Sequence, residues 1–234
     1  PGDGVTLAQV EILSPLLYPG KILCAGANYY DHMAEMGFPG VKKEEQKLFF
    51  FMKPPRQAIV GPGDTVVMPR GTQKFDWEIE LAAVIGRTTR YVTPEQALEH
   101  VAGYTISIDL SARDFNMVPD QFYKFDWVAG KAGDTCCPTG PWIVPAEALG
   151  DPQGVKLRLS VDGTVMQDST TAQMIYSVAE QISRASEIMT LEPGDLVLTG
   201  TPAGVGVPRG VFLKPGSRID SEIAGIGRLS VGVL

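Results

Sequence analysis

The sequence predicts one domain of the α+β class, with a mixed, mostly β core and a few peripheral helices. Pro-Gly pairs begin at residues 1, 19, 39, 62, 193 and 215, and this pair favours the centre of a type II turn. Several pairs are followed by β-rich runs, and three segments carry helix-capping signals. No linker or low-complexity stretch divides residues 1–234. The 26 Gly and 18 Pro residues therefore indicate turns between strands.

Strands are expected where apolar and β-branched residues lie between turn residues. The longest apolar run, 48–52, suits a buried strand, and Asp162-Gly163 is typical of a two-residue hairpin turn. The predicted strands cover residues 21–25, 48–52, 58–61, 65–68, 77–85, 104–110, 156–162, 196–199, 219–223 and 228–234.

Three helices are predicted from their ends. Thr93 and Gln96 form a capping box with Pro at the first helical position, and the helix is expected to run to residue 102. Ser177 and Glu180 form a second capping box, which opens a helix with an apolar face at 178, 182, 185, 188 and 189. A short third helix is expected from Asn28 as N-cap to Gly37.

Composition excludes several classes of protein. The formal charge is −7, with no basic cluster, which argues against a nucleic-acid or anionic-membrane partner. No apolar run approaches the ~20 residues of a membrane span. Three cysteines without a signal peptide predict a cytoplasmic protein with no disulfide scaffold, and only two histidines make a Cys/His zinc site unfavourable. Because residue 1 is Pro, we expect a short N-terminal piece to precede this sequence.

The most informative stretch is the acidic strand 76–84. Alternate residues of a strand share a face, so Asp76, Glu78 and Glu80 are expected to point the same way. One interpretation is a half-buried strand with a wet face. The other is a divalent cation, because the strand continues as an apolar run and Asp109 ends a second apolar strand. Three carboxylates favour Mg²⁺, Mn²⁺ or Ca²⁺ over Zn²⁺.

Several motifs in order resemble the fumarylacetoacetate hydrolase family. The sequence is similar to its GxNYxxHxxE, DxExEL, DxSARD, GKxxD…GPW and TGTPxGVG motifs, and a Lys-Pro pair follows the first of them. These segments lie at 26–35, 53–54, 76–81, 109–114, 130–134, 140–142 and 199–206. The match spans residues 26–206, so the chain is identified as a member of the family, of the single catalytic-domain bacterial type.

The resemblance implies a β-roll or sandwich with peripheral helices, usually a homodimer. It also implies a set of site residues. The metal ligands are Glu78, Glu80 and Asp109, the catalytic residues are His32, Glu35 and Lys131, and the substrate-binding residues are Tyr29, Arg113, Asn116 and Thr201. Many family members carry Gln where this chain has Asn116, which indicates a different substrate contact there.

These residues suit a hydrolase. His32 and Glu35 share a face of a helical turn, and a carboxylate beside an imidazole raises its basicity, as a general base for water requires. A divalent metal, Mg²⁺ or Mn²⁺, with Ca²⁺ as a further candidate, stabilises an enolate, while Lys131 and Arg113 hold anionic charge. The expected substrate is a 2-oxo acid or an acylpyruvate-like 1,3-diketone, cleaved at a C–C bond in the breakdown of aromatic compounds.

Two other functions stay open from the sequence. A lyase or isomerase, such as an oxaloacetate-type decarboxylase or a hydroxymuconate-like dienoate isomerase, would use the same metal without an attacking water. A metal-free binding protein on the same fold is a third hypothesis, which the intact acidic and His-Glu motifs oppose. The flexible, charged stretch 37–45 is expected to act as a lid over the substrate.

Several conspicuous residues are expected to have no role in catalysis. His100 lies at the end of its helix, where a cation suits the helix dipole. Cys136 and Cys137 have no neighbouring base in sequence and are expected to serve packing. Trp77 and Trp142 are expected to be core residues.

Overall fold

A computed structural model describes residues 4–234, so the predicted turn at Pro1-Gly2 lies outside the described residues. The helices are α1 Tyr30–Glu35, α2 Pro94–Ala97, α3 Arg113–Asn116, α4 Trp127–Lys131, α5 Ala146–Leu149, α6 Val178–Ile188 and α7 Gly206–Arg209. The strands are β1 Ile22–Gly26, β2 Phe49–Lys53, β3 Ile59–Val60, β4 Thr65–Val66, β5 Phe75–Asp76, β6 Ile79–Ile85, β7 Val101–Ile108, β8 Ser111–Ala112, β9 Cys137–Pro145, β10 Lys156–Val161, β11 Thr164–Thr170, β12 Leu196–Leu198, β13 Arg218–Ile223 and β14 Gly227–Val233.

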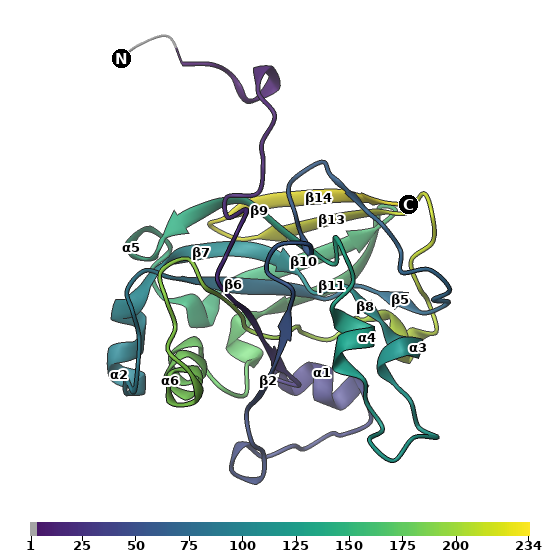
Figure 1. Cartoon of the computed structure of the whole chain (residues 1–234), viewed down its shortest axis with the longest axis horizontal. Helices are drawn as coiled ribbons and strands as arrows, with labels where there is room; N and C mark the ends of the chain where they lie inside the picture. Colours follow the sequence, from purple (N-terminus) through teal and green to yellow (C-terminus); the bar gives the residue numbers. More distant parts are fainter. Residues whose placement is uncertain (1–3) are drawn as a thin grey trace.

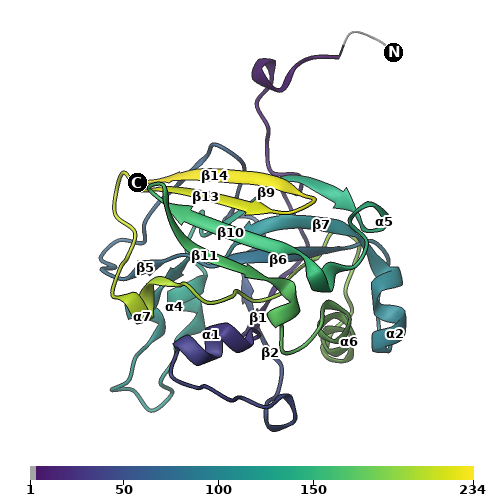
Figure 2. The same cartoon turned by 180° about the vertical axis from the view of Figure 1, so that it is seen from behind.

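Two sheets pack on one another, and short helices surround them (Figure 1, and from behind in Figure 2). The larger sheet has the order β2-β1-β12-β6-β7-β9-β3, and the smaller has the order β11-β10-β13-β14-β4. Strands β5 and β8 form a separate two-stranded pair. The predicted α+β class with a mostly β core is confirmed.

Both faces of the larger sheet are buried, and the alternation in β6 shows how. Leu81 and Ala83 belong to the main core, with residues of the smaller sheet such as Leu159. Ala82 and Val84 point to the other face, into a second core cluster. Each fully buried aliphatic side chain of Val or Leu size contributes about 2 kcal/mol. The acidic strand therefore runs through the interior, and the wet-face interpretation of it is wrong.

Helix α6 confirms its sequence prediction most closely. Its capping box is formed, with the Ser177 hydroxyl accepting from the Glu180 N–H at 3.2 Å. Val178, Ile182 and Ala185 are buried as predicted, but Ile188 is half exposed at the last turn. Helices α2 and α6 lie side by side at one end of the sheets, away from α3 and α4 (Figures 1 and 2).

The two other helices differ from their predictions. The helix after Thr93 ends at His100 rather than residue 102, through a 3₁₀ turn over Leu98–His100, because Val101 starts strand β7. The N-cap of α1 is Tyr29 and not Asn28. Asn28 instead donates its amide to the carbonyls of Tyr176 and Thr199, at 3.0 and 2.9 Å. A long-range contact thus replaces the local cap.

Several strand and core predictions also need correction. Strand β2 forms, but Phe49 and Met52 are exposed, because β2 is an edge strand of the larger sheet. Strand β9 was not predicted. Trp77 is fully buried as expected, whereas Trp142 is 41% exposed and donates its ring N–H to the Ile226 carbonyl. The core prediction for Trp142 is wrong because this side chain lies along the sheet margin.

The Pro-Gly turns are confirmed where Gly takes a positive φ. Gly63, Gly194 and Gly216 have φ between 81° and 91°, the left-handed region that glycine adopts without steric cost. The hairpin turn at Asp162 and Gly163, with φ of 49° and 79°, is also confirmed. No helix among residues 4–234 combines the length and apolar character that a bilayer span requires.

Candidate active site

Three carboxylates meet at the ends of two neighbouring strands. Strands β6 and β7 are antiparallel with Ile79 opposite Ile108, and the Asp109 N–H donates to the Glu78 carbonyl at 2.8 Å. Glu78 and Asp109 therefore lie side by side, and Glu80 follows one step along β6. Carboxylate oxygens of all three residues lie within 4.8 Å of one another, and all three are buried. We call Glu78, Glu80 and Asp109 the carboxylate trio.

The electrostatics of the trio show an excess of negative charge. Burial, followed by the charges of Asp109 and Glu78, raises the pKa of Glu80 well above its usual value. Burial also raises the pKa of Asp109, in spite of Lys131 and Lys53. For Glu78 the effect of burial is outweighed by Arg113 and Lys131, which lower its pKa to about 2. Removing like charges from water without a counter-charge is costly.

Three cations partly compensate the carboxylates. Lys131, at the end of α4, places Nζ 2.6 Å from both Glu78 Oε2 and Asp109 Oδ2. Arg113 contacts Glu78 and places Nε 2.9 Å from Asp76 Oδ2. Lys53 Nζ lies 2.8 Å from Asp109 Oδ1. With Asp76 counted among the carboxylates, four formal negative charges face three positive ones, which leaves one negative charge in the interior.

This donor set fits a hard divalent cation. All the offered ligands are carboxylate oxygens, the type that Mg²⁺, Mn²⁺ and Ca²⁺ prefer. Asp109 Oδ1 is buried, and the Lys53 ammonium lies 2.8 Å from it in an ion-pair contact that does not have hydrogen-bond geometry. One formal negative charge is left uncompensated by Lys53, Lys131 and Arg113, and a bound cation would neutralise it.

The His32–Glu35 pair is formed on helix α1. His32 Nδ1 lies 2.7 Å from Glu35 Oε1, and the Gly204 N–H donates to Glu35 Oε2 at 2.8 Å. His32 is close enough to Glu78 for its charge to favour the ionised form of that carboxylate. Both side chains of the pair are mostly buried. The pair is thus held in place from the C-terminal part of the chain and faces the trio.

The remaining predicted site residues lie in different surroundings. The Thr201 hydroxyl donates to the Ile79 carbonyl and accepts from Gln167 Nε2, both at 2.8 Å. Tyr29 is fully buried, and burial followed by the charge of Glu80 raises the pKa of its hydroxyl. Asn116 donates to the Asp126 carbonyl at 3.2 Å, so it closes the loop between α3 and α4. Asn116 has no contact with the trio in this arrangement.

The sequence did not assign roles to several groups that hold the site together. The Gly200 N–H donates to Glu80 Oε2 at 2.6 Å, and the Gly204 N–H holds Glu35. Asp76 accepts from the N–H groups of Trp77 and Gly206, at 2.8 and 2.7 Å. The motif at 199–206 was the available signal, because glycine allows a backbone N–H to approach a side chain closely.

The expected bystanders contact other parts of the molecule. His100 Nδ1 lies 3.0 Å from the Thr89 hydroxyl. Cys136 and Cys137 are buried, and burial, the largest effect, raises the pKa of both thiols, which agrees with packing. The proposed lid segment 37–45 is largely exposed and is tethered at Lys43, whose Nζ lies 2.6 Å from Glu180 Oε1.

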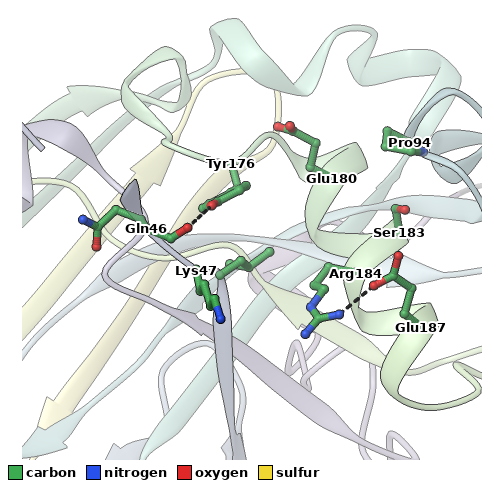
Figure 3. A pocket seen from close by; sticks show the side chains of 9 residues that line it. Gln46, Lys47, Pro94, Tyr176, Glu180, Ser183, Arg184 and Glu187 are labelled. Carbon is green, nitrogen blue, oxygen red and sulfur yellow. Dashed lines mark hydrogen bonds and ion pairs between the residues drawn. The ribbon is translucent and has the colours of Figure 1, made fainter. Parts of the chain in front are cut away.

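A separate cavity of about 440 Å³ lies between α6 and residues 46–48 (Figure 3). The Tyr176 hydroxyl donates to the Gln46 carbonyl at 2.9 Å, and Arg184 pairs with Glu187 at 2.6 Å. None of its lining residues belongs to the predicted site. This cavity therefore adds nothing to the carboxylate site.

Comparisons with known proteins show the family to which the chain belongs. The family model "Fumarylacetoacetate (FAA) hydrolase C-terminal" matches residues 21–234. The chain is 43% identical over 222 residues to the mitochondrial oxaloacetate tautomerase FAHD2A of Bos taurus. The aligned segment covers 94% of this chain and 68% of the relative.

Two solved structures are also similar. The 5-carboxymethyl-2-hydroxymuconate delta-isomerase of Mycobacterium smegmatis has a TM-score of 0.84 at 38% identity, covering 100% of this chain and 86% of that one. The fumarylpyruvate hydrolase of Pseudomonas aeruginosa, in complex with Mn²⁺ and pyruvate, has a TM-score of 0.83 at 37% identity, covering 98% and 99%. The predicted resemblance is thus confirmed over almost the whole chain, and the protein belongs to the fumarylacetoacetate hydrolase family of enzymes.

Proposed function

We propose that this enzyme hydrolyses a C–C bond in a 2-oxo acid or an acylpyruvate-like 1,3-diketone, as in the breakdown of aromatic compounds. The observation that carries the proposal is the His32–Glu35 pair, 2.7 Å apart and held by the Gly204 N–H at 2.8 Å. A histidine with one ring nitrogen fixed by a carboxylate is suited to take a proton from water. The similarity to the fumarylpyruvate hydrolase supports the same reaction class.

The carboxylate trio is proposed to hold Mg²⁺ or Mn²⁺, with Ca²⁺ as a further candidate. When bound, such an ion supplies Lewis-acid stabilisation of a carbonyl or enolate oxygen. The Mn²⁺ in the similar hydrolase structure supports a divalent ion in this family. The all-carboxylate donor set, and the negative charge that the neighbouring cations leave uncompensated, support it in this chain.

The side chains around the trio suggest their parts in the reaction. Glu35 accepts a hydrogen bond from His32 Nδ1, which leaves Nε2 to receive the proton of water. The water oxygen then bonds to the distal carbonyl carbon. As the C–C bond breaks, its electron pair stays on the 2-oxo acid fragment, and this fragment takes up the proton that His32 received. Lys131 and Arg113 are proposed to hold the carboxylate or oxyanion charge that develops there.

A second candidate is tautomerisation, isomerisation or decarboxylation of a 2-oxo acid at the same site. The sequence identity of 43% to an oxaloacetate tautomerase favours this second candidate. These reactions also pass through an enolate, but no water attacks a carbon. His32 would then act only on a substrate proton, or not at all.

The experiment compares two reactions in one set of variants. Pyruvate release from acylpyruvates reports hydrolysis, and the enol-to-keto change of oxaloacetate, followed by ultraviolet absorbance, reports tautomerisation. We expect His32→Ala to lower hydrolysis by about 10²–10⁴-fold, the usual contribution of a general base. His100→Ala is the matched control, because the His100 ring is hydrogen-bonded to Thr89 and to no residue of the predicted site.

The outcomes separate the two functions. If the wild type hydrolyses acylpyruvates and His32→Ala does so at the same rate, the proposed role of the His32–Glu35 pair is wrong. Tautomerisation without any hydrolysis, across the acylpyruvates tested, would favour the second function. Activity that resists EDTA and does not respond to added Mg²⁺ or Mn²⁺ would contradict the metal site.

A further inference from the structure

Lys53 is a fully buried lysine at the end of strand β2, next to the site but outside the catalytic roles proposed above. It is 1% exposed. Its Nζ donates to the carbonyls of Leu110 and Lys131, at 3.0 and 2.6 Å. The same Nζ lies 2.8 Å from Asp109 Oδ1. One ammonium group thus joins three separate segments of the chain.

The two carbonyls that Lys53 bonds lie where regular structure ends. Leu110 lies two residues after the end of β7, and Lys131 is the last residue of α4. The last carbonyls of a helix have no partner within the helix, and a buried carbonyl without a partner costs free energy. Lys53 satisfies both groups, and it thereby fixes the backbone from which Asp109 and Lys131 extend.

The contacts of Lys53 and Lys131 with Asp109 use different oxygens. Lys131 Nζ lies 2.6 Å from Asp109 Oδ2, while Lys53 lies next to Oδ1. Lys53 Nζ donates to the two carbonyls and in addition lies in ion-pair contact with Oδ1, although this contact does not have hydrogen-bond geometry. The two lysines thus hold the Asp109 carboxylate by its two different oxygens, which fixes its position beside Glu78.

We propose that Lys53 is a positioning residue that holds the Asp109 carboxylate and the Lys131 backbone in the arrangement required for divalent-cation binding. This inference rests on the proposed metal site. For the affinity of the site for a divalent ion, it predicts the opposite of what charge alone would predict. Removing a cation next to the trio would, by Coulomb attraction alone, tighten the binding of a divalent ion. Loss of positioning would weaken it, as changes in groups that orient metal ligands commonly do by 10–100-fold.

The test measures Mn²⁺ binding to the purified protein by titration calorimetry and by the electron paramagnetic resonance spectrum of bound Mn²⁺. The variant is Lys53→Met, which keeps the length of the side chain and removes the ammonium. We expect the Kd for Mn²⁺ to rise about 10-fold or more, with a changed spectrum of the bound ion. Lys21→Met is the matched control, because Lys21 pairs with buried Asp195 at 2.7 Å and contacts no site residue. Its Kd should stay at the wild-type value.

The outcomes distinguish this inference from the metal proposal. If the wild type binds no Mn²⁺, the metal site itself is wrong. If wild type and Lys53→Met bind with equal affinity, or the variant binds more tightly, only the positioning role is overturned. If Lys53→Met does not fold, Lys53→Arg, which keeps the positive charge but cannot reproduce the contacts of the ammonium, is used instead: loss of positioning again raises the Kd, whereas charge alone leaves it unchanged. If neither variant shows the wild-type circular dichroism spectrum, Lys53 serves folding and the inference is wrong.

Discussion

Asp76 is expected to be one of the residues most important for stability, although it is not part of the carboxylate trio. Its Oδ1 accepts from the N–H groups of Trp77 and Gly206, and its Oδ2 accepts from Arg113 Nε at 2.9 Å and from the Val207 N–H at 3.2 Å. Asp76→Asn would keep the first two bonds. It would turn an amide N–H₂ toward two donors and remove the charge that faces Arg113.

The size of the effect follows from these contacts. Breaking a buried ion pair costs about 3–5 kcal/mol, and here Arg113 keeps its second partner, Glu78. We therefore expect Asp76→Asn to lower the free energy of unfolding by about 3 kcal/mol. Asp114→Asn is the control. Asp114 also accepts from a hydroxyl and a backbone N–H, those of Thr72 and Gln73, but it is partly exposed, so we expect about 1 kcal/mol.

The assay is urea unfolding at pH 7 followed by far-ultraviolet circular dichroism. Equal slopes for wild type and variants would show that the denatured states are comparable. A loss in Asp76→Asn no larger than that in Asp114→Asn would refute the reasoning. That result would mean that the other partners of Arg113 compensate its charge without Asp76.

Three further predictions follow from the site and its surroundings. Glu35→Gln should lower the hydrolysis rate by at least about 10-fold while Mn²⁺ affinity stays unchanged, since Glu35 orients His32 but is not in the trio; a changed Kd in calorimetry would contradict this. Mg²⁺ at 100 times its Kd should raise the free energy of unfolding by about 2.7 kcal/mol, and EDTA should reverse the gain, as measured by urea unfolding. In the folded protein Lys43 and Ser177 outweigh burial and lower the pKa of the Glu180 carboxyl. The ionised carboxylate therefore stabilises the fold above the unfolded pKa, and this stabilisation is lost as the pH falls through the folded pKa. Glu180→Gln should therefore cost about 0.5 kcal/mol at pH 7 and progressively less as the pH is lowered, and a loss that does not change with pH would count against the ion pair.

The sequence predicted elements whose signals are local. The capping box of α6, the Asp-Gly hairpin and the Pro-Gly turns at 39, 62, 193 and 215 are set by neighbouring residues and are confirmed. The type II turn predicted at Pro19-Gly20 is wrong, because Gly20 does not take a positive φ. Strand β9 was missed because Pro138, Pro141 and Pro145 oppose a strand prediction, while its neighbours in the sheet provide the pairing. The cap of α1 was wrong because Asn28 bonds to residues 148 and 171 positions away.

The same distinction holds at the site. The alternation of Asp76, Glu78 and Glu80, together with Asp109 at the end of a second apolar strand, was sufficient to propose the trio as one of two interpretations, because the acidic residues follow the period of a strand. The contacts that organise the trio join segments far apart in the chain: Lys53 reaches Lys131, and Gly200 reaches Glu80. Spacing in sequence cannot show such contacts, so Lys53 and Asp76 were noted only as parts of motifs.

The hydrogen bond between Gly204 and Glu35 has a consequence for biosynthesis. The two residues are 169 positions apart, and strand β12 lies between β1, to which it is parallel, and β6, to which it is antiparallel. While the chain emerges from the ribosome, the larger sheet lacks this interior strand until residue 198 has been made. Pairings of such long range slow folding and leave apolar strands exposed meanwhile. The nascent chain is therefore expected to need protection by chaperones, and a chain truncated before residue 196 would be inactive and prone to aggregate.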